Sequence, residues 1–235
     1  MEITKRQSKV LNTIVREYIE LAQPVSSQFL EKKYNFKICP ATIRIEMQRL
    51  TDRGFLYQPH TSAGRIPTDK GYRFFVNDLL EKGTSEFKDI FEIKEIIKRE
   101  DDIFELISHL SKFLAEISSN LAVTHLQGKD FFWKEGWEEI LKEPEFEEKD
   151  FVFEFTDFLK NFEENIENLN INSGIKIFIG RENPFSKIKD FSIISSKCFL
   201  PNREEAILAL LGPKRMTYEK NISLINYLTK LMERL

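Results

Sequence analysis

The order of helical and extended patterns in the first 80 residues constrains the fold of this chain more than any other feature. Apolar residues recur at helical spacing over residues 4–22, over a short segment that follows, and over residues 40–54. Short apolar segments around a turn-rich stretch then predict a hairpin over residues 55–67, and a fourth helix follows it. Three helices, a hairpin and a helix are the layout of a winged helix-turn-helix, which we predict for residues 1–82.

Capping signals mark where these helices begin. Thr4 and Gln7 have the spacing of a capping box, in which the hydroxyl and the amide each satisfy a free backbone N–H. Either Ser26 or Ser27 can serve as the N-cap of the second helix. Pro40 suits the first position of the third helix, because its fixed φ angle is already helical and its missing N–H would have no partner there.

The rest of the chain is predicted to be an α+β domain with a mainly antiparallel sheet. Residues 83–120 carry two amphipathic helical patterns, which we interpret as a helical linker with candidate dimerisation helices. Residues 121–235 form the α+β domain, and a final helix begins at about Thr217. The strands expected in this domain are residues 121–126, 131–133, 175–179, 191–199 and 206–211.

Charge is distributed unevenly along the chain. Residues 1–80 contain 13 Lys or Arg and 8 Asp or Glu, whereas residues 81–235 contain 22 and 30. Because residues 1–80 are basic and the rest of the chain is acidic, we infer that residues 1–80 bind an anionic partner.

The sequence carries no segment typical of a membrane or secreted protein. No run approaches the roughly 18 apolar residues of a spanning helix, and the N-terminus leads into a helical pattern instead of a signal peptide. Two cysteines, Cys39 and Cys198, are too few for a disulfide framework. We therefore expect a cytoplasmic protein with no membrane partner.

Catalytic patterns are absent from the sequence. His60, His109 and His125 lie in different predicted elements, and none has a nucleophile pattern beside it. The glycine-rich phosphate and dinucleotide motifs and the H-E-x-x-H metal motif are also missing. We therefore expect that the chain is not an enzyme and needs no metal or cofactor.

The outer face of the third helix is the first candidate site. Ile43, Met47 and Leu50 recur at helical spacing and are expected to face inward. The positions that then face outward or lie at the margin are Thr42, Arg44, Ile45, Gln48 and Arg49. Arginine and glutamine pair with base edges in the major groove, and isoleucine can contact a thymine methyl group. A solvated helix face is the alternative, although an exposed isoleucine fits it poorly.

The hairpin is the second candidate site. We expect Arg65 at the tip of the loop, where it could enter a minor groove and meet its concentrated negative potential. Other side chains suited to phosphate oxygens are His60, Thr61 and Ser62 in the loop, and Ser26 and Ser27 at a helix N-terminus. An ordinary surface hairpin and ordinary helix capping are the alternatives.

Several motifs resemble those of one known family. In the first domain they are Pro40-Ala41-Thr42-Ile43-Arg44 with Glu46-Met47, and Pro59-His60-Thr61-Ser62-Ala63-Gly64-Arg65-Ile66-Pro67-Thr68-Asp69-Lys70-Gly71-Tyr72-Arg73. Further on they are Pro144-Glu145-Phe146, Ile179-Gly180-Arg181-Glu182-Asn183-Pro184 and Leu211-Gly212-Pro213-Lys214-Arg215-Met216. With these motifs the chain resembles the heat-inducible transcription repressor HrcA family. The resemblance implies a winged-helix DNA-binding domain, a GAF-like domain, and repression of chaperone genes through an inverted-repeat operator.

The chain departs from the family pattern in three places. Cys39 stands where the family usually has serine, and Ile45 stands where it usually has asparagine. Between Leu126 and Pro144 the chain lacks the long stretch that, in the family, completes the GAF-like sheet and carries an inserted dimerisation domain. The resemblance therefore implies a reduced GAF-like domain, and it leaves open the dimer interface and the chaperonin-dependent control associated with the family.

We therefore predict a sequence-specific repressor that binds double-stranded DNA as a homodimer. The alternative is a winged helix used for protein contacts, attached to a ligand-sensing GAF-like domain. The basic first part and Arg65 favour DNA binding. A ligand sensor should have convergent polar groups in the second half, and none stands out in the sequence. The dimer contact is expected beyond residue 83, where a broad apolar stripe comprises Phe87, Ile90, Phe91, Ile93, Ile96 and Ile97. Packing of this stripe on the chain's own core is the alternative.

Overall fold

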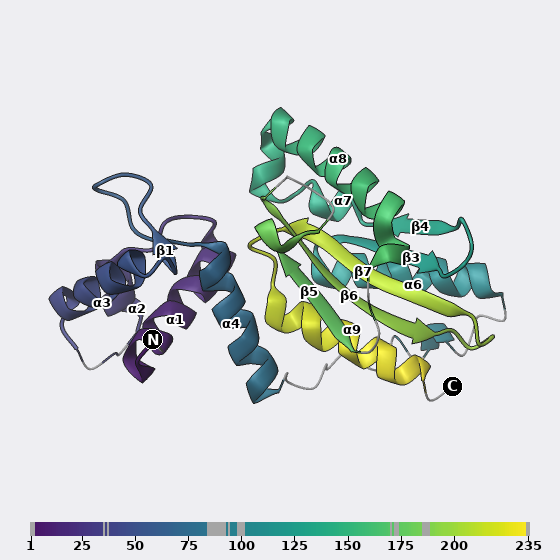
Figure 1. The fold of residues 1–235 in the computed structure, drawn as a ribbon, viewed down its shortest axis with the longest axis horizontal. Helices are drawn as coiled ribbons and strands as arrows, with labels where there is room; N and C mark the ends of the chain where they lie inside the picture. The colour runs from purple at the N-terminus through teal and green to yellow at the C-terminus, as the bar shows by residue number, and fades with distance from the viewer. Residues whose placement is uncertain are drawn as a thin grey trace. The chain divides into compact units, whose positions relative to one another are not determined.

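The chain folds as two compact units, residues 1–83 and 84–235, in a computed structural model (Figure 1). The structure describes residues 3–34, 36, 38–83, 93, 95–97, 102–169, 171, 174–184 and 189–233. The first unit is mainly helical and the second combines helices with a five-stranded sheet. The α+β class predicted from the sequence is confirmed.

The first unit is a winged helix-turn-helix, as predicted. Its elements are α1 (Lys5–Leu21), α2 (Ser27–Lys33), α3 (Pro40–Asp52), β1 (Leu56–Tyr57), β2 (Ile66–Pro67) and α4 (Asp69–Lys82). The two strands pair in the antiparallel sense, with Leu56 opposite Pro67 and Tyr57 opposite Ile66. The loop between them is the wing.

The caps of the first unit follow the sequence signals. The Thr4 hydroxyl accepts from the backbone N–H of Gln7, and the Gln7 side chain accepts from that of Thr4, which completes the predicted capping box. Ser26 is the N-cap of α2 and Thr68 is the N-cap of α4. Cys39 makes no side-chain cap bond to the backbone, so the start of α3 depends on the proline that follows it.

A single apolar core holds the first unit together. Its buried side chains include Val10, Leu11, Ile14 and Val15 of α1, Leu30 of α2, Ile43, Met47 and Leu50 of α3, and Tyr72, Phe75, Val76 and Leu79 of α4. All of them lie on the inward stripe of their helix. Because α3 is packed along this stripe, its opposite face is left to solvent.

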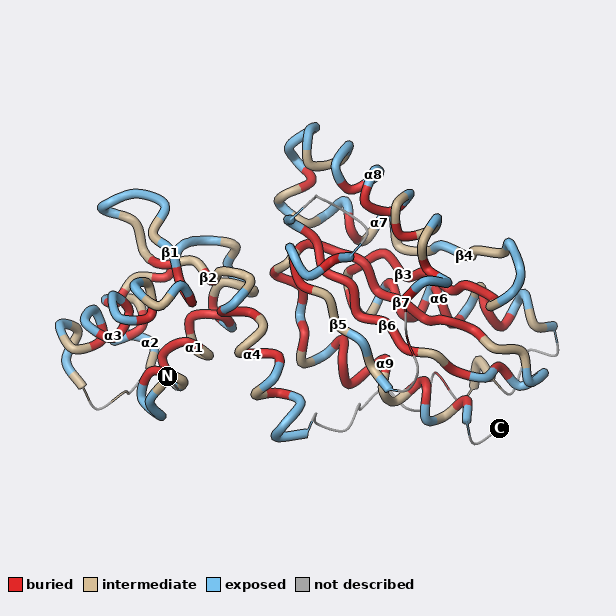
Figure 2. The backbone as a smooth tube through the Cα atoms, in the orientation of Figure 1, coloured by how far each residue is buried: buried red, intermediate tan, exposed pale blue. Residues whose placement is uncertain are grey.

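The second unit contains a five-stranded antiparallel sheet with the strand order β4-β3-β7-β6-β5. Its elements are α6 (Ile103–Ser118), β3 (Leu121–Leu126), β4 (Phe132–Glu135), α7 (Trp137–Ile140), η1 (Pro144–Glu147), α8 (Lys149–Asn165), η2 (Ile166–Asn168), β5 (Ile175–Ile179), η3 (Gly180–Glu182), β6 (Phe191–Phe199), β7 (Glu205–Pro213) and α9 (Tyr218–Met232). The predicted strands and the antiparallel sheet are confirmed. Figure 2 shows the central strands as a buried region with exposed turns.

Helices cover both faces of this sheet. Helix α8 lies over one face, and helices α6 and α9 lie over the other (Figure 1). Phe155 of α8 is fully buried, and its ring centroid lies 5.2 Å from those of Phe146 and Phe191 and about 6 Å from those of Trp137 and Phe158. Such tilted and edge-to-face packing stabilises aromatic clusters beyond the area they bury.

Helix α6 belongs to the second unit by its packing. Its apolar face contacts β3 and β4, and the boundary between the two units lies at Gly83. The helical pattern that precedes α6 falls largely outside the described residues, although Ile93 is buried and residues 95–97 are helical. A role of residues 83–120 in dimerisation therefore stays a prediction.

Two of the sequence motifs meet through Arg215, which joins the segment after β7 to η1. Its Nη2 lies 2.8 Å from Oε2 of Glu145, and the guanidinium also pairs with Glu143. Burial disfavours the charged form, but the hydrogen bonds and charges of the two carboxylates raise the pKa of Arg215. The arginine therefore remains charged and ties two distant segments together.

Replacement of Phe155 by alanine is expected to lower the free energy of unfolding of the second unit by about 3–5 kcal/mol, because it leaves a cavity among four aromatic rings. Phe153, two residues earlier on the same helix, is 70% exposed, and Phe153→Ala should change stability by no more than about 0.5 kcal/mol. Denaturant unfolding of both variants measures the difference. Equal effects would contradict the assignment of the core.

Candidate nucleic-acid interface

The outward face of α3 carries the residues that the sequence placed there. Arg44, Gln48 and Arg49 are exposed, and Thr42 is half-buried. Ile45 is 52% exposed, which is unusual for an isoleucine on a helix whose other face is packed. The arrangement follows from the helical period, since the buried residues occupy the opposite stripe.

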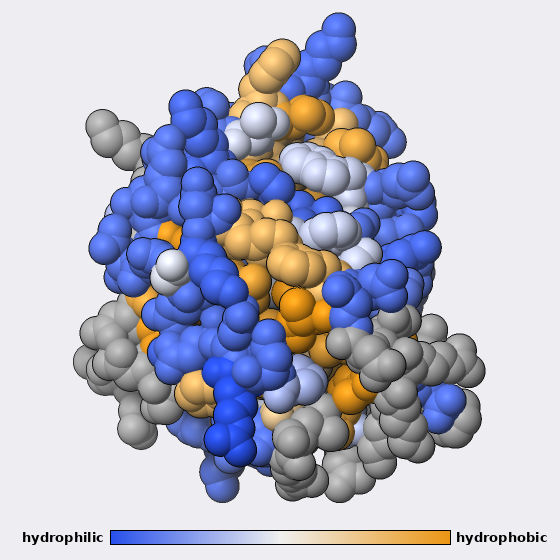
Figure 3. Space-filling view, turned by 90° about the vertical axis from the view of Figure 1, so that its right-hand side faces the viewer, coloured by the Kyte–Doolittle hydropathy of each residue, from blue (hydrophilic) through white to orange (hydrophobic). Residues whose placement is uncertain are grey.

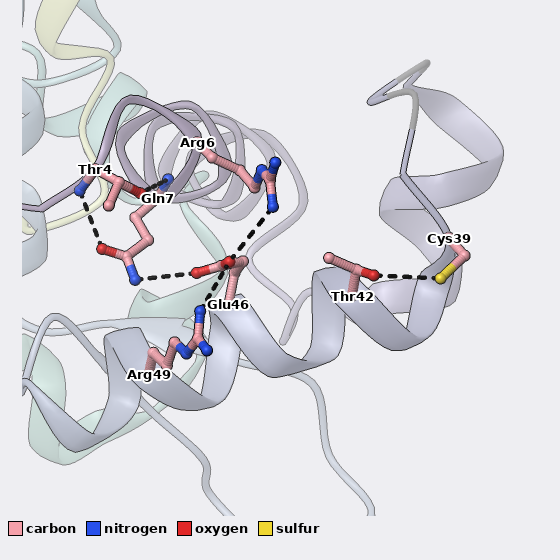
Figure 4. A network of polar contacts seen from close by, with 7 residues as sticks. All are labelled: Thr4, Arg6, Gln7, Cys39, Thr42, Glu46 and Arg49. Atoms are coloured by element: carbon pink, nitrogen blue, oxygen red, sulfur yellow. Dashed lines mark hydrogen bonds and ion pairs between the residues drawn. The ribbon is translucent and has the colours of Figure 1, made fainter.

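A buried carboxylate that the sequence analysis missed anchors this helix to α1. Glu46 is only 4% exposed, and Figure 4 shows its carboxylate between side chains of both helices. Nε2 of Gln7 donates to it at 3.0 Å and Nη1 of Arg49 at 3.2 Å, while Arg6 approaches to 3.9 Å. Glu46 follows Ile43 by three residues, so the helical period places it on the inward stripe of α3. Its burial could therefore have been predicted from the sequence.

The pairing with Glu46 distinguishes the two arginines of the outward face. Arg49 is drawn toward α1 by the buried carboxylate, although 58% of its side chain stays exposed. Arg44 lies one turn earlier, near the N-terminal end of α3, and lines a groove on the side of the wing. Arg44 and Arg49 thus serve opposite margins of the same helix face.

The tip of the wing is held by its own side chains. Nε2 of Gln58 donates to the backbone carbonyl groups of Thr61 at 2.8 Å and Ala63 at 2.9 Å. Nδ1 of His60 lies 3.0 Å from the Ser62 hydroxyl. His60, Thr61 and Ser62 are exposed, so the side chains expected to meet phosphates lie at the surface of the tip.

Arg65 does not lie at the tip of the wing, where the sequence analysis placed it. It lies at the foot of the wing and is 8% exposed. Its backbone N–H and carbonyl pair with the carbonyl and N–H of Val25, at 2.8 and 3.0 Å, and this short bridge turns the side chain inward. There Nε donates to the hydroxyl of Thr51 at 3.0 Å and Nη2 donates to Oε1 of Gln48 at 2.9 Å. Burial lowers the pKa of Arg65, and the charge of Arg44 lowers it further.

A polar groove of about 410 Å³ lies between the wing, the first turn of α2 and the middle of α3. Its lining includes Ser26, Ser27, Arg44, Gln48, Thr61, Ser62 and Arg65. The hydroxyl of Ser26 accepts the cap hydrogen bond from Phe29 N–H at 3.1 Å, and Ser27 is buried. The structure thus brings together most of the candidate residues around one concave surface. The candidates outside its lining are Thr42, Ile45, Arg49 and His60.

Neither a metal site nor a membrane span emerges from the described residues. No three of their His, Cys, Asp or Glu side chains gather as metal ligands would. None of the helices formed by this part of the chain is both long enough and apolar enough to cross a bilayer.

The fold and the exposed face of α3 define the class of winged-helix transcription regulators. A family model described as the HrcA protein C-terminal domain matches residues 72–222, which is more than half of the chain. The chain belongs to the HrcA family.

Relatives from several bacteria carry the same family name. The chain is 29% identical over 325 positions to the heat-inducible transcription repressor HrcA of Natranaerobius thermophilus, covering 96% of this chain and 94% of that protein. It is 27% identical to that of Thermodesulfovibrio yellowstonii, covering 99% and 97%. Over 136 residues it is 43% identical to that of Desulfitobacterium hafniense, covering 56% and 39%. These relatives are named as repressors, which agrees with the expectation that the chain is not an enzyme.

The alignment also measures how much shorter this chain is. An alignment of 325 positions that includes 96% of 235 residues leaves about 100 positions without a counterpart here. A solved structure described as a hypothetical protein superposes with a TM-score of 0.80 at 22% identity, covering 99% of this chain and 98% of that one. This likeness supports the fold alone.

Replacement of Gly64 by alanine is expected to lower the free energy of unfolding of the first unit by about 1–3 kcal/mol. A Cβ atom there would collide with the backbone of Val25 and lie 2.7 Å from the carbonyl carbon of Pro24. This collision outweighs the gain of about 0.4–1 kcal/mol that a glycine-to-alanine change gives through the unfolded state. Thermal unfolding measures the change, with Ala63→Ser as the neutral control; a stabilised Gly64→Ala variant would disprove the close approach.

Proposed function

We propose that this protein is a sequence-specific, DNA-binding transcription repressor of heat-shock genes that acts in the cytoplasm as a homodimer on an inverted-repeat operator. The observation that carries the proposal is the exposed face of α3, where Arg44, Ile45 and Gln48 lie near a wing with exposed polar side chains. Membership of a family whose relatives are named heat-inducible transcription repressors supports it.

The chemistry of this face suits the major groove. Arg44 and Gln48 supply side chains that make paired hydrogen bonds with guanine and adenine, and Ile45 supplies an apolar contact for a thymine methyl group. Arg49, held at the opposite margin by Glu46, suits a contact with the sugar-phosphate backbone. Thr61 and Ser62 at the wing and Ser26 at the start of α2 add donors for phosphate oxygens.

An inverted repeat requires two copies of the winged helix related by a two-fold axis. We place the contact between copies in the second unit. Phe104 at the start of α6 is 48% exposed, and with Trp133 of β4 it lines a groove of about 350 Å³. In the space-filling view of Figure 3, apolar residues form a band between hydrophilic margins on the face that is drawn. Exposed apolar side chains such as Phe104 are a common feature of subunit contacts.

Regulation by a chaperonin is implied by the family resemblance. We retain it as part of the proposal on that ground. Addition of chaperonin to the operator-binding assay is its direct test, with an increase in affinity as the expected outcome.

Replacement of Arg44 or of Arg49 by alanine should weaken operator binding, and the two variants should differ in how the loss depends on DNA sequence and on salt. Arg44→Ala should cost about 1–3 kcal/mol of binding free energy and relax sequence specificity, because a base contact is lost. Arg49→Ala should weaken binding to all sequences alike and lower the salt slope by about one unit, because a phosphate contact is lost. Fluorescence-anisotropy titrations on operator and scrambled duplexes measure both effects. Lys112→Ala, which removes an exposed charge in α6, is the control, and unchanged affinity in both arginine variants would defeat the proposal.

The full chain is expected to be a dimer, whereas a fragment of residues 1–83 is expected to be a monomer. The fragment keeps its own apolar core and the whole of α4, so it should fold, but it lacks the surface around Phe104. Light scattering of both species measures their masses, and titration on one and two half-sites measures the effect on affinity. A full chain that stays monomeric and binds one half-site as tightly as two would rule out the dimer.

A further inference from the structure

The carboxamide of Gln48 is held from two sides. Nη2 of Arg65 donates to its Oε1 at 2.9 Å, and its Nε2 donates to Oδ1 of Asp52 at 2.8 Å. An arginine can only donate and a carboxylate can only accept, so the two partners determine which end of the amide faces which neighbour. An exposed glutamine is ordinarily free to turn its amide over, and this one is restrained in a single orientation.

Arg65 is itself restrained. Its backbone pairs in both directions with Val25, its Nε is bonded to Thr51, and the residue is 8% exposed. The arginine therefore joins three parts of the first unit, namely the segment before α2, the last turns of α3 and the foot of the wing. The Gln48 side chain is restrained in turn, because its movement would break the hydrogen bond that Nη2 of the buried guanidinium donates.

We propose that Arg65 is a positioning residue that sets the base preference of α3 by holding the Gln48 carboxamide in one orientation. The inference rests on the proposed function and deepens it. In this orientation Oε1 keeps one acceptor site and Nε2 keeps one N–H. That pair matches the adenine edge in the major groove, where N6 donates and N7 accepts. The base pair read by Gln48 is therefore an A·T pair, and Arg65 acts on it without touching DNA.

This role differs from the one expected at the loop tip. An arginine inserted into a minor groove contributes its charge to binding, and its removal lowers the salt slope by about one unit. A positioning arginine leaves the salt slope unchanged, and its removal relaxes discrimination at one base pair. The two roles therefore predict opposite results in the same titration.

The test uses the full chain and the duplex that it selects from a randomised library. Wild type and the variants Arg65→Met, Gln48→Ala and Arg65→Met with Gln48→Ala are titrated on this duplex and on its single-base-pair substitutions, at several salt concentrations. Arg65→Met keeps most of the apolar stem and removes the donors. Asp52→Ala is a second variant, which releases the amide from the other side at an exposed position that does not endanger the fold.

The expected result is a shared change at one position. A well-formed glutamine–adenine pair discriminates by roughly 5- to 150-fold, and both Arg65→Met and Gln48→Ala should lose most of that factor at the same A·T pair. The double variant should lose no more of this discrimination than Gln48→Ala does. Asp52→Ala should lose part of the discrimination at the same A·T pair. The salt slope of Arg65→Met should equal that of wild type.

Other results overturn the inference and can be told apart from a failure of the proposed function. Uniform weakening on every duplex, relaxation at a different base pair from Gln48→Ala, or a salt slope lowered by one unit in Arg65→Met would each defeat the positioning role while specific DNA binding stands. A wild-type chain that selects no sequence would defeat the proposed function, and the inference with it.

Discussion

The orientation of α3 depends on one carboxylate buried between two helices. Glu46 is almost inaccessible, and a charge in that place is tolerated only if its partners replace the water it has lost. Gln7 and Arg49 do so, and Gln7 also closes the capping box of α1. The start of α1, the rotation of α3 and the placement of one outward arginine therefore follow from contacts with the same carboxylate.

Most of the fold could be predicted because its signals are local. Capping residues, helical periodicity and the turn-rich wing each lie within a few residues of the structure they specify, and the caps at Thr4, Ser26 and Thr68 follow from them. Apolar segments likewise identified the strands. The order of the strands across the sheet could not be predicted, since the pairing of β3 with β7 joins residues 80 to 90 positions apart.

The candidate site was predicted unevenly for the same reason. The faces of α3 follow from its period, and the exposed Ile45 lies where that period places it. Arg65 was misplaced because turn propensity locates a loop but does not reveal that residue 65 pairs with Val25, 40 positions earlier. Glu46 was passed over because a charged residue is usually assigned to the surface, although its spacing argued otherwise.

The hydrogen bonds of Gln58 across the wing have a consequence for the thermodynamics of recognition. A flexible loop loses conformational entropy when it settles on a partner, and that loss subtracts from the affinity. In this wing the loss occurs during folding, since Gln58 already holds the backbone at Thr61 and Ala63. Side chains at the tip can therefore be exchanged without changing the loop conformation, so that new contacts can be acquired there by single substitutions.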